Sequence, residues 1–297
     1  MIQKEKNEIG QFIPLHYHFQ MLADTSRMTT FRAAIEQVVT PKHRVADLGS
    51  GTGVLSFYAA KQGARVWAVE YNPALVSASR KLISENGVSD RVQIFEADAS
   101  SWLPPEPVDI VICEMLHSAL LREKQVQVIS SFRDAHYARF GKAPYMLPYA
   151  TLLAVQPVWQ RYEFNGYHAP VPLFQSPYAT TDDCCACGEP IVYKILEYEN
   201  AHVETFEADV CFSFQNDLDV NALRFITKSI LSIDLIKGQT IDWHSQHLIL
   251  PLSQPVQMHA GETMRVRFAY QPGDSIETLN NAINVEIVIS KSSENLK

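Results

Sequence analysis

The central part of the chain alternates short apolar runs of strand length with longer runs whose apolar residues have helical spacing. The apolar runs cover residues 44–49, 65–70, 92–97 and 108–114. The helical runs cover about 53–62, 73–86 and 119–138. Strands that alternate with helices pair in parallel through right-handed crossovers. The pattern therefore predicts a Rossmann-like, doubly wound α/β domain.

Different patterns flank this region. Residues 16–39 carry apolar positions at helical spacing, which predicts one or two amphipathic helices. After Phe140 the helical spacing ends, prolines become frequent, and short alternating runs indicate antiparallel strands. These runs cover residues 203–214, 246–252, 263–270 and 282–290. We therefore expect helices in residues 1–40, the α/β domain in 41–147 and an antiparallel β-barrel or sandwich in 148–297, with an excursion at about 159–190.

Composition narrows the class of protein. The formal net charge of −8 argues against a general binder of nucleic acid or of an anionic membrane, since both require concentrated positive potential, and it suits a cationic substrate. No apolar run is long enough to cross a bilayer, and the polar start of the chain lacks the features of a secretory signal. We therefore expect a cytoplasmic protein.

The five cysteines fit a reducing compartment. Cys113 and Cys211 lie in apolar, strand-like runs, where a free thiol behaves as a small hydrophobe. Cys184, Cys185 and Cys187 lie close together, but no second pair completes a tetrahedral metal site, so we expect no bound metal. Four histidines are expected to be structural or solvated, namely His16, His117, His136 and His247.

A glycine-rich turn follows the first expected strand. Gly49, Gly51 and Gly53 let the backbone turn sharply and let a ligand approach the main chain, although such a turn also forms without a ligand. Glu70 ends the next strand, where a carboxylate accepts hydrogen bonds from ribose hydroxyls of either a nicotinamide cofactor or S-adenosylmethionine (SAM). The spacing G-x-G-x-G differs from the dinucleotide pattern G-x-G-x-x-G. Asp47 would repel a pyrophosphate but suits the cationic methionine end of SAM, so the residues favour SAM.

Asp98 follows the third expected strand and is placed to accept a hydrogen bond from an adenine amino group, although a solvated loop acid is an equal alternative for this residue alone. Together with the glycine turn, Asp47 and Glu70, it resembles the class I SAM-dependent methyltransferases over about residues 42–140. The resemblance implies SAM as the methyl donor and S-adenosylhomocysteine as the product.

Two glutamates bracket a short loop after the fourth expected strand. Glu114 ends that strand and Glu123 lies in the next helical run, at the sheet edge where open α/β sheets bind ligands. Most glutamates are solvated, so the pair could also be one buried strand-end acid and one surface acid. Eight residues separate the two, as in the double-glutamate loop of the protein arginine methyltransferases, a family that nearly the whole chain resembles. The resemblance implies that both glutamates hold the methyl acceptor and that Glu114 also borders the cofactor.

The amino-terminal segment matches the same family. His18, Met21 and Asp24 fall on its H-x-x-M-L-x-D segment, and Arg27 falls on the arginine that follows. The resemblance implies a helix that closes over SAM. In that helix His18 and Arg27 would hold the methionine carboxylate, and Met21 would contact the cofactor.

The carboxy-terminal half matches as well. Residues 145–148 resemble the proline-containing passage into the family's β-barrel, and His244 falls on the histidine of its T-H-W loop. The resemblance pairs His244 with Asp24, a candidate relay for the proton that must leave. It also implies that residues 159–190 form a short arm that docks on a second copy in a two-fold dimer.

An arginine acceptor makes chemical sense of the two glutamates. A guanidinium keeps its charge because its pKa lies above about 12, and two carboxylates can hold it by charge-assisted hydrogen bonds. Such binding places one terminal nitrogen near the SAM methyl group and draws positive charge toward the others. Positioning and electrostatics would then supply most of the catalysis.

Three segments depart from the family pattern and leave the acceptor open. The stretch near 8–12 lacks the tyrosines of the Y-F-x-x-Y motif, residues 115–118 replace the usual W-M-G-Y, and residues 243–245 lack the flanking Thr and Trp of the T-H-W loop. Protein arginine is one acceptor, and a free amino acid or a small guanidine or amine is another. A catalytically weak SAM-binding partner of another subunit is the third possibility, and the intact Glu114 and Glu123 count against it.

Overall fold

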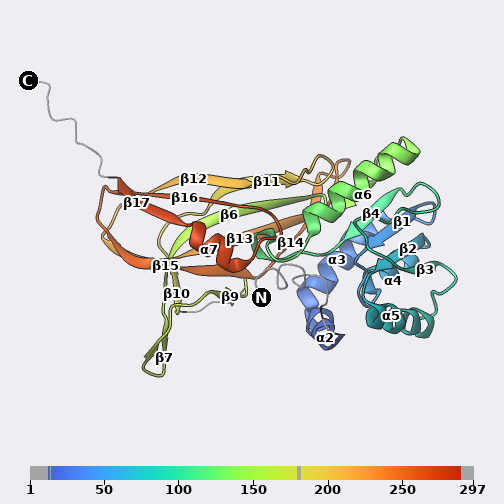
Figure 1. Ribbon diagram of the computed structural model, residues 1–297, viewed down its shortest axis with the longest axis horizontal. Coiled ribbons are helices and arrows are strands. Elements are labelled where there is room, and N and C mark those ends of the chain that lie inside the picture. Colours follow the sequence, from blue (N-terminus) through green and yellow to red (C-terminus); the bar gives the residue numbers. More distant parts are fainter. Residues whose placement is uncertain (1–12, 14, 179–181, 289–297) are drawn as a thin grey trace, which may run out of the picture.

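The computed structural model describes residue 13 and residues 15–178 and 182–288. An α/β domain and an antiparallel β-domain lie side by side, and the chain passes between them from strand β5 (Tyr145–Leu147) to strand β6 (Ala150–Gln160) (Figure 1). Buried side chains of the two domains belong to one continuous hydrophobic core. The stretch near residues 8–12, which lacks the family's tyrosines, lies outside the described residues.

The α/β domain is built on a five-stranded sheet with the order β3-β2-β1-β4-β5, in which every pairing is parallel. Its other strands are β1 (Arg44–Leu48), β2 (Arg65–Glu70), β3 (Val92–Glu96) and β4 (Ile110–Cys113). The helices between them are α4 (Val54–Lys61), α5 (Pro73–Glu85) and α6 (Gln125–Phe140). The strand order reverses between β1 and β4, the place where sheets of this kind bind ligands. The predicted doubly wound α/β fold is confirmed.

Local sequence sets the ends of these helices. The Asn72 side chain accepts a hydrogen bond from the backbone N–H of Ala74 at 3.0 Å, and Pro73 occupies the first turn of α5, where its missing N–H costs nothing. Gly141 ends α6 in the left-handed conformation, with φ of 65°. The sheet and its connections are therefore encoded by short-range signals.

Two helices precede the sheet, α2 (Leu15–Ala23) and α3 (Thr25–Val38). Asp24 separates them and caps α3, because its side chain accepts from the backbone N–H of Arg27 at 3.0 Å. Helix α3 buries Phe31, Ala34 and Ile35, whereas α2 buries no residue. Helix α3 is therefore anchored in the core, and α2 is a lightly held cover beside the domain.

The β-domain contains a seven-stranded and a three-stranded sheet, and all of their pairings are antiparallel. The larger sheet has the order β10-β6-β13-β15-β9, with β11 paired to β6 and β14 paired to β13. Its strands are β6, β9 (Leu173–Gln175), β10 (Cys184–Ala186), β11 (Ile191–Glu197), β13 (Leu218–Asp234), β14 (Gln239–His244) and β15 (His247–Met258). The smaller sheet has the order β12-β16-β17, from β12 (Phe206–Ser213), β16 (Thr263–Tyr270) and β17 (Asn284–Val288), and helix α7 (Ile276–Ala282) connects the last two. This is the antiparallel barrel domain that the sequence predicts.

Within residues 159–190, strands β7 (Glu163–Phe164) and β8 (Tyr167–His168) form a hairpin that projects from the β-domain (Figure 1). Strand β9 then pairs with β15, and β10 pairs with β6. The excursion predicted from sequence is therefore the β7–β8 hairpin, followed by strands β9 and β10, which pair with the seven-stranded sheet.

Two expectations are wrong. The helix expected at 119–138 begins only at Gln125, because Ala119, Leu120 and Arg122 have positive φ values of 56°, 54° and 63°, which a right-handed helix excludes. A short 3₁₀ turn, η1 (Ser118–Leu120), stands in its place. Cys211 lies on the exposed face of β12 and does not pack as a core hydrophobe, whereas Cys113 is buried in β4 as expected.

The described helices include none that is long and apolar enough to span a membrane. Within the same part of the chain, no group of three or more histidine, cysteine or acidic side chains is arranged to hold a metal ion.

Candidate active site

A tight turn carries the chain from β1 into α4. Gly49, Gly51 and Gly53 have φ values of 72°, 54° and 83°, in the left-handed region that side chains rarely adopt. The backbone N–H groups of Gly49 and Ser50 both donate to the Val69 carbonyl at 2.9 Å, which ties the turn to β2. The turn itself therefore requires glycine at these three positions.

Helix α2 comes close to this turn at Gly51. A Cβ atom at Gly51 would lie 2.8 Å from Cε1 of His18, closer than side chains pack. Burial lowers the pKa of the His18 imidazole, and the charge of Arg27 lowers it further, so the ring is neutral at neutral pH. Because Gly51 has no side chain, the α2 helix can place the His18 ring against the turn.

Two carboxylates lie behind the turn. Asp47 is buried and accepts a hydrogen bond from the Ser56 hydroxyl at 2.6 Å, and burial raises the pKa of its carboxyl group to about 7. Glu70 accepts from the backbone N–H of Gly51 at 2.9 Å and from that of Asn72 at 2.8 Å, which fixes its carboxylate at the end of β2. A cation bound beside Asp47 would restore its charged form.

A cavity of about 280 Å³ opens over the turn. Five buried polar atoms on its lining residues have no hydrogen-bond partner in the described part of the chain, among them Nε2 of His18, Nε of Arg27 and Oγ of Ser50. Buried polar atoms are normally paired, so this lining is incomplete without a polar ligand. A methionine carboxylate, an ammonium group and ribose hydroxyls would satisfy these atoms together with Asp47 and Glu70. The residues present therefore fit SAM.

The predicted cofactor residues, except Gly53, all line this cavity; they are His18, Met21, Arg27, Asp47, Gly49, Gly51, Glu70, Asp98 and Glu114. Gly53 instead precedes α4 and packs on Ile83. The Asp98 carboxylate accepts from the backbone N–H and the hydroxyl of Ser100 through Oδ1, at 2.8 and 2.7 Å. Its assignment to adenine stays a prediction.

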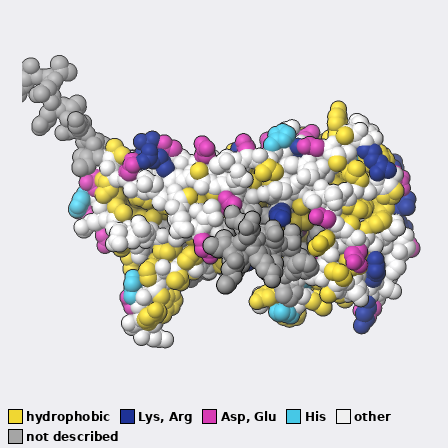
Figure 2. Space-filling view, viewed as in Figure 1, with side chains coloured by type: hydrophobic (Ala, Val, Ile, Leu, Met, Phe, Trp, Pro, Cys, Tyr) yellow, Lys and Arg dark blue, Asp and Glu magenta, His cyan; other side chains and the backbone are white. Residues whose placement is uncertain are grey.

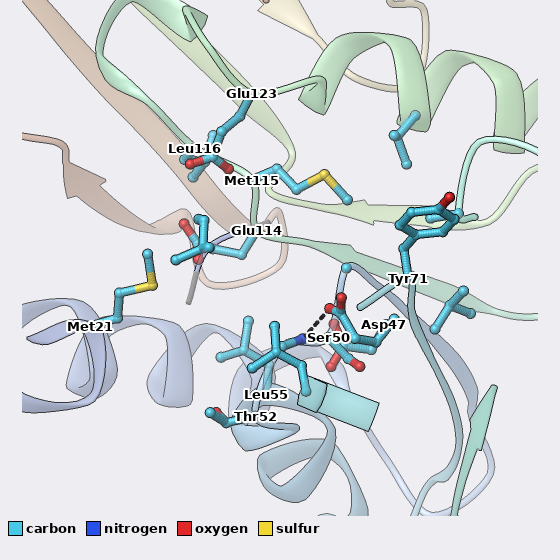
Figure 3. Close-up of a pocket in the computed structure, with 18 of the residues that line it drawn as sticks. Met21, Asp47, Ser50, Thr52, Leu55, Tyr71, Glu114, Met115, Leu116 and Glu123 are labelled. Atoms are coloured by element: carbon cyan, nitrogen blue, oxygen red, sulfur yellow. Dashed lines mark hydrogen bonds between the residues drawn. The ribbon is translucent and has the colours of Figure 1, made fainter. Parts of the chain in front are cut away.

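Glu114 and Glu123 face the same cavity from the loop between β4 and α6. Figure 3 shows both on one wall of the pocket, with Asp47 across from them. Oε2 of Glu114 forms an ion pair with the Arg27 guanidinium, while its Oε1 is buried without a partner among the described residues. Burial raises the pKa of Glu114 against the opposing effect of Arg27. Burial and the charge of Glu114 raise the pKa of Glu123 to about 7.

A second cavity adjoins the first at Met21, Arg27 and Leu116, which line both. Asp24 and His244 both line this second cavity, but no hydrogen bond or ion pair joins them in the residues that the structure describes. The Asp24 side chain caps α3, and Nε2 of His244 lies 3.9 Å from a carboxylate oxygen of Asp242. The pairing of His244 with Asp24 therefore stays a prediction without a direct contact behind it.

The sequence did not reveal most of the wall of this second cavity. The ring of Phe174 packs edge-on against that of His117 with centroids 5.5 Å apart, and the Tyr178 hydroxyl lies 3.4 Å from Oγ of Ser26. Trp243 lines another side of this cavity, and the centroid of its ring lies 5.7 Å from the Arg27 guanidinium carbon. Only the match to the T-H-W loop pointed toward Trp243. Phe174 and Tyr178 follow an irregular hairpin and carry no local signal of a site.

His117 borders the second cavity, and its Nδ1 lies 3.1 Å from the Ser118 carbonyl, which is compatible with the structural role expected for it. His136 does have a structural role, since its Nε2 accepts from the backbone N–H of Val108 at 3.0 Å. The two histidines differ in their neighbours, which the sequence around them does not reveal.

Comparisons with known proteins agree with this geometry. A model of the methyltransferase domain family matches residues 45–136. An uncharacterized protein of Methanocaldococcus jannaschii is 24% identical, over 89% of this chain and 95% of its own. The arginine N(omega)-methyltransferase of Streptomyces achromogenes is 27% identical, over 86% of this chain and 76% of its own.

Solved structures of protein arginine methyltransferases have a similar fold. The Trypanosoma brucei PRMT1 enzyme–prozyme heterotetrameric complex with AdoHcy contains a chain that superposes with a TM-score of 0.69 at 18% identity, over 91% of this chain and 96% of that one. The SAM-fitting cleft, the two-domain fold and the sequence matches together make this chain a SAM-dependent methyltransferase that is similar to the arginine methyltransferases.

Proposed function

We propose that the protein transfers the methyl group of SAM to a terminal guanidinium nitrogen of arginine. The observation that carries the proposal is the placement of Glu114 and Glu123 on one wall of the cleft, beside the groups that fit SAM. Two carboxylates in this arrangement favour a planar cation over a neutral acceptor.

The contacts of the two glutamates support this acceptor. Glu114 already pairs with one guanidinium, that of Arg27, and its Oε1 is buried with no partner among the residues that the structure describes. In the described part of the chain no hydrogen bond or ion pair reaches the carboxylate of Glu123. An incoming guanidinium would donate to these free oxygens and lower the pKa of both carboxyl groups, so its binding favours their charged forms.

The reaction balances without further reagents. A guanidinium nitrogen forms a bond to the methyl carbon, the carbon–sulfur bond breaks, and its electron pair stays on sulfur, which leaves a neutral thioether. The methylated nitrogen then gives up a proton. His244 and Asp24 border the second cavity, so their role in the proposal is to pass this proton to solvent through bridging water.

The remaining assignments belong to the same proposal. His18, Met21 and Arg27 cover SAM from α2 and α3, with the two basic side chains at its carboxylate. Asp47 stabilises the methionine cation, Glu70 holds the ribose, and Asp98 binds the adenine amino group.

Free arginine or a small guanidine or amine is the second candidate acceptor. The Streptomyces relative, whose name gives arginine as its acceptor, matches most of both chains. Phe174 and Tyr178 also wall the second cavity, where the rest of an acceptor would lie. A protein arginine and a free arginine share the reacting group, so the two candidates differ only in what surrounds it.

We also infer that two copies associate through the β7–β8 hairpin. Phe164 and Tyr167 on this hairpin are 50% and 72% exposed, and Figure 2 shows hydrophobic side chains on the projection. The Trypanosoma brucei neighbour is itself part of a heterotetrameric complex.

Methyl transfer from labelled SAM to three acceptors tests the function. An arginine-rich peptide, free arginine and a lysate would each be incubated with the purified protein. Label on one of the first two identifies the acceptor class. If the protein binds SAM but labels none of the three acceptors, arginine methylation is refuted. The remaining possibility is then a catalytically weak SAM-binding partner of another subunit.

The variants Glu114→Gln and Glu123→Gln test the two glutamates directly. Each keeps the side-chain shape but removes a charge that holds the acceptor, so we expect turnover to fall by at least about a hundredfold while SAM still binds. Glu207→Gln is the matched control, because Glu207 is an exposed acid of β12 far from the cleft lining. Unchanged turnover in either test variant would contradict the assignment.

A further inference from the structure

The loop between the two glutamates has an unusual backbone. Ala119, Leu120 and Arg122 all have positive φ, and none of them is glycine. This conformation is strained for residues with a side chain, and it persists only where surrounding structure imposes it. Something outside the loop must therefore hold it.

The β-domain supplies that restraint at Ala119. Oγ1 of Thr227, in the middle of β13, accepts a hydrogen bond from the Ala119 N–H at 2.7 Å. The Tyr270 hydroxyl, at the end of β16, donates to the Ala119 carbonyl at 2.9 Å. Both backbone groups of one left-handed residue are thus bound by side chains of the other domain. Thr227 is fully buried and Tyr270 is 3% exposed, so water cannot replace either bond.

A second tyrosine orients this contact. The Tyr193 hydroxyl lies 2.7 Å from that of Tyr270. Since Tyr270 gives its proton to Ala119, it accepts the proton of Tyr193, which fixes the direction of both bonds. Burial raises the pKa of both phenols, so both stay protonated and can donate.

The two ends of the loop are held separately. On the Glu123 side, the Gly273 N–H donates to the Leu120 carbonyl at 2.8 Å, and the Arg122 N–H donates to the Asp274 carbonyl at 2.8 Å. On the Glu114 side, the buried Gln125 side chain donates to the Cys113 carbonyl and accepts from the Met115 N–H, both at 2.8 Å. Among the described residues, Thr227 and Tyr270 make the polar contacts of Ala119 to the β-domain, and beside them the Ser118 hydroxyl donates to the Gln246 carbonyl.

We propose that Thr227 and Tyr270 are positioning residues for methyl transfer: by clamping Ala119, the β-domain sets the separation of Glu114 and Glu123. Neither residue lines the SAM cavity or the adjoining one. Their effect on the reaction therefore passes through the loop. A released Ala119 returns to a right-handed or extended conformation, and the backbone that carries Glu123 turns with it.

The substitution Thr227→Val tests the clamp with little change in side-chain shape. It leaves the Ala119 N–H buried and unpaired, and we expect kcat to fall about tenfold or more while the dissociation constant of SAM changes less than about twofold. Thr227→Ser keeps the hydroxyl and should restore most of kcat. Tyr270→Phe removes the other bond and should act in the same direction.

Matched controls separate positioning from general loss of stability. Thr151→Val removes a hydroxyl from a fully buried threonine of β6, whose partners are Tyr198 and Ser229. Tyr145→Phe removes a hydroxyl that accepts from the Ile233 N–H at 3.1 Å at the domain boundary. Both controls should lower the melting temperature without changing kcat.

Hydrogen exchange gives a readout that needs no acceptor. The amide of Ala119 should exchange faster in Thr227→Val than in the wild-type protein, while amides in β1 and β4 stay protected. The turnover arm rests on the proposed methyl transfer, but the exchange arm does not. An inactive wild-type protein would therefore count against the function alone. Unchanged exchange at Ala119, unchanged kcat, or a proportional loss of SAM affinity would each overturn the clamp.

Discussion

At the scale of single residues, burial makes Glu123 titrate close to neutral pH. Its pKa is raised to about 7, first by loss of solvent and then by the charge of Glu114. The protonated form cannot hold a guanidinium by an ion pair, and the guanidinium itself stays charged. We therefore expect kcat/KM for the acceptor to increase as pH rises through about 7 and then to level off, which a pH–rate profile measures.

The neighbouring Arg122 provides a check on this assignment. Its positive charge lowers the pKa of Glu123, so Arg122→Gln should move the midpoint of the profile to higher pH. Lys61→Gln changes an exposed charge at the end of α4, outside the cavity lining, and serves as the control. A profile that is flat between pH 6 and about 8, or a midpoint that Arg122→Gln moves downward, would be inconsistent with Glu123 as the titrating group.

The identity of these residues could be predicted from the sequence, but their ion pairing and protonation state could not. The spacing of Glu114 and Glu123 is visible in the chain, as are Asp47 and Glu70 at the ends of two strands. The pairing of Glu114 with Arg27 depends on where α3 lies against the sheet, across 87 positions of sequence. Shifts in pKa follow from such packing, and so they appear only in the folded protein.

At the scale of elements, the fit between α2 and the glycine turn yields a prediction. An alanine at Gly51 would place its Cβ 2.8 Å from the His18 ring, and α2 buries no residue that could hold it in place against this contact. We expect Gly51→Ala to displace α2 and weaken SAM binding at least about tenfold, measured by calorimetry.

Gly87→Ala is the matched control for this change. Gly87 has a comparable φ of 69°, so alanine suffers the same backbone strain there, but nothing lies within 4 Å of its Cβ position. Both variants should lose similar stability, and only Gly51→Ala should lose SAM affinity. Equal SAM affinity in the two variants would mean that α2 does not cover the cofactor through Gly51.

Elements with short-range signals were predicted well, and the loop between the glutamates was not. The strand at 65–70 and the strand at 263–270 have the bounds that the alternating pattern predicts. Residues 119–124 carry good helix formers, yet they form no α-helix, because Thr227 and Tyr270 bind the backbone of Ala119 from another domain. A contact across more than 100 positions has no local trace in the sequence.

At the scale of the whole molecule, the β-domain takes part in the site as well as supporting it. It supplies the Thr227 and Tyr270 contacts to the loop and, through Phe174, Tyr178 and Trp243, much of the wall of the second cavity. The order of the two domains follows from the change in periodicity after Phe140. Their relative placement does not, because it depends on one shared core that long-range packing creates.

The exposed surface suggests how two such molecules associate. Apolar side chains project from the β7–β8 hairpin, and a second apolar group, Leu15, Phe19 and Leu22, lines a groove between α2 and α5, with exposed fractions of 49%, 73% and 41%. In a two-fold dimer the hairpin of each copy can cover α2 of the other copy, so the same contact occurs twice. Such a contact would also press α2 onto the SAM cleft, and dimerisation would then strengthen SAM binding.

The double variant Phe164→Asp/Tyr167→Asp tests this arrangement. Burial of two carboxylates in an apolar contact is unfavourable, so we expect a dimer of the wild-type protein and a monomer of the variant in analytical ultracentrifugation, with weaker SAM binding in the monomer. Glu163→Gln, which changes the same exposed hairpin without adding charge, should leave the dimer intact. A wild-type monomer at micromolar concentration would contradict the dimer. If the variant stays dimeric, the interface does not lie at the hairpin, because two buried carboxylates at the centre of an apolar interface are incompatible with a stable contact.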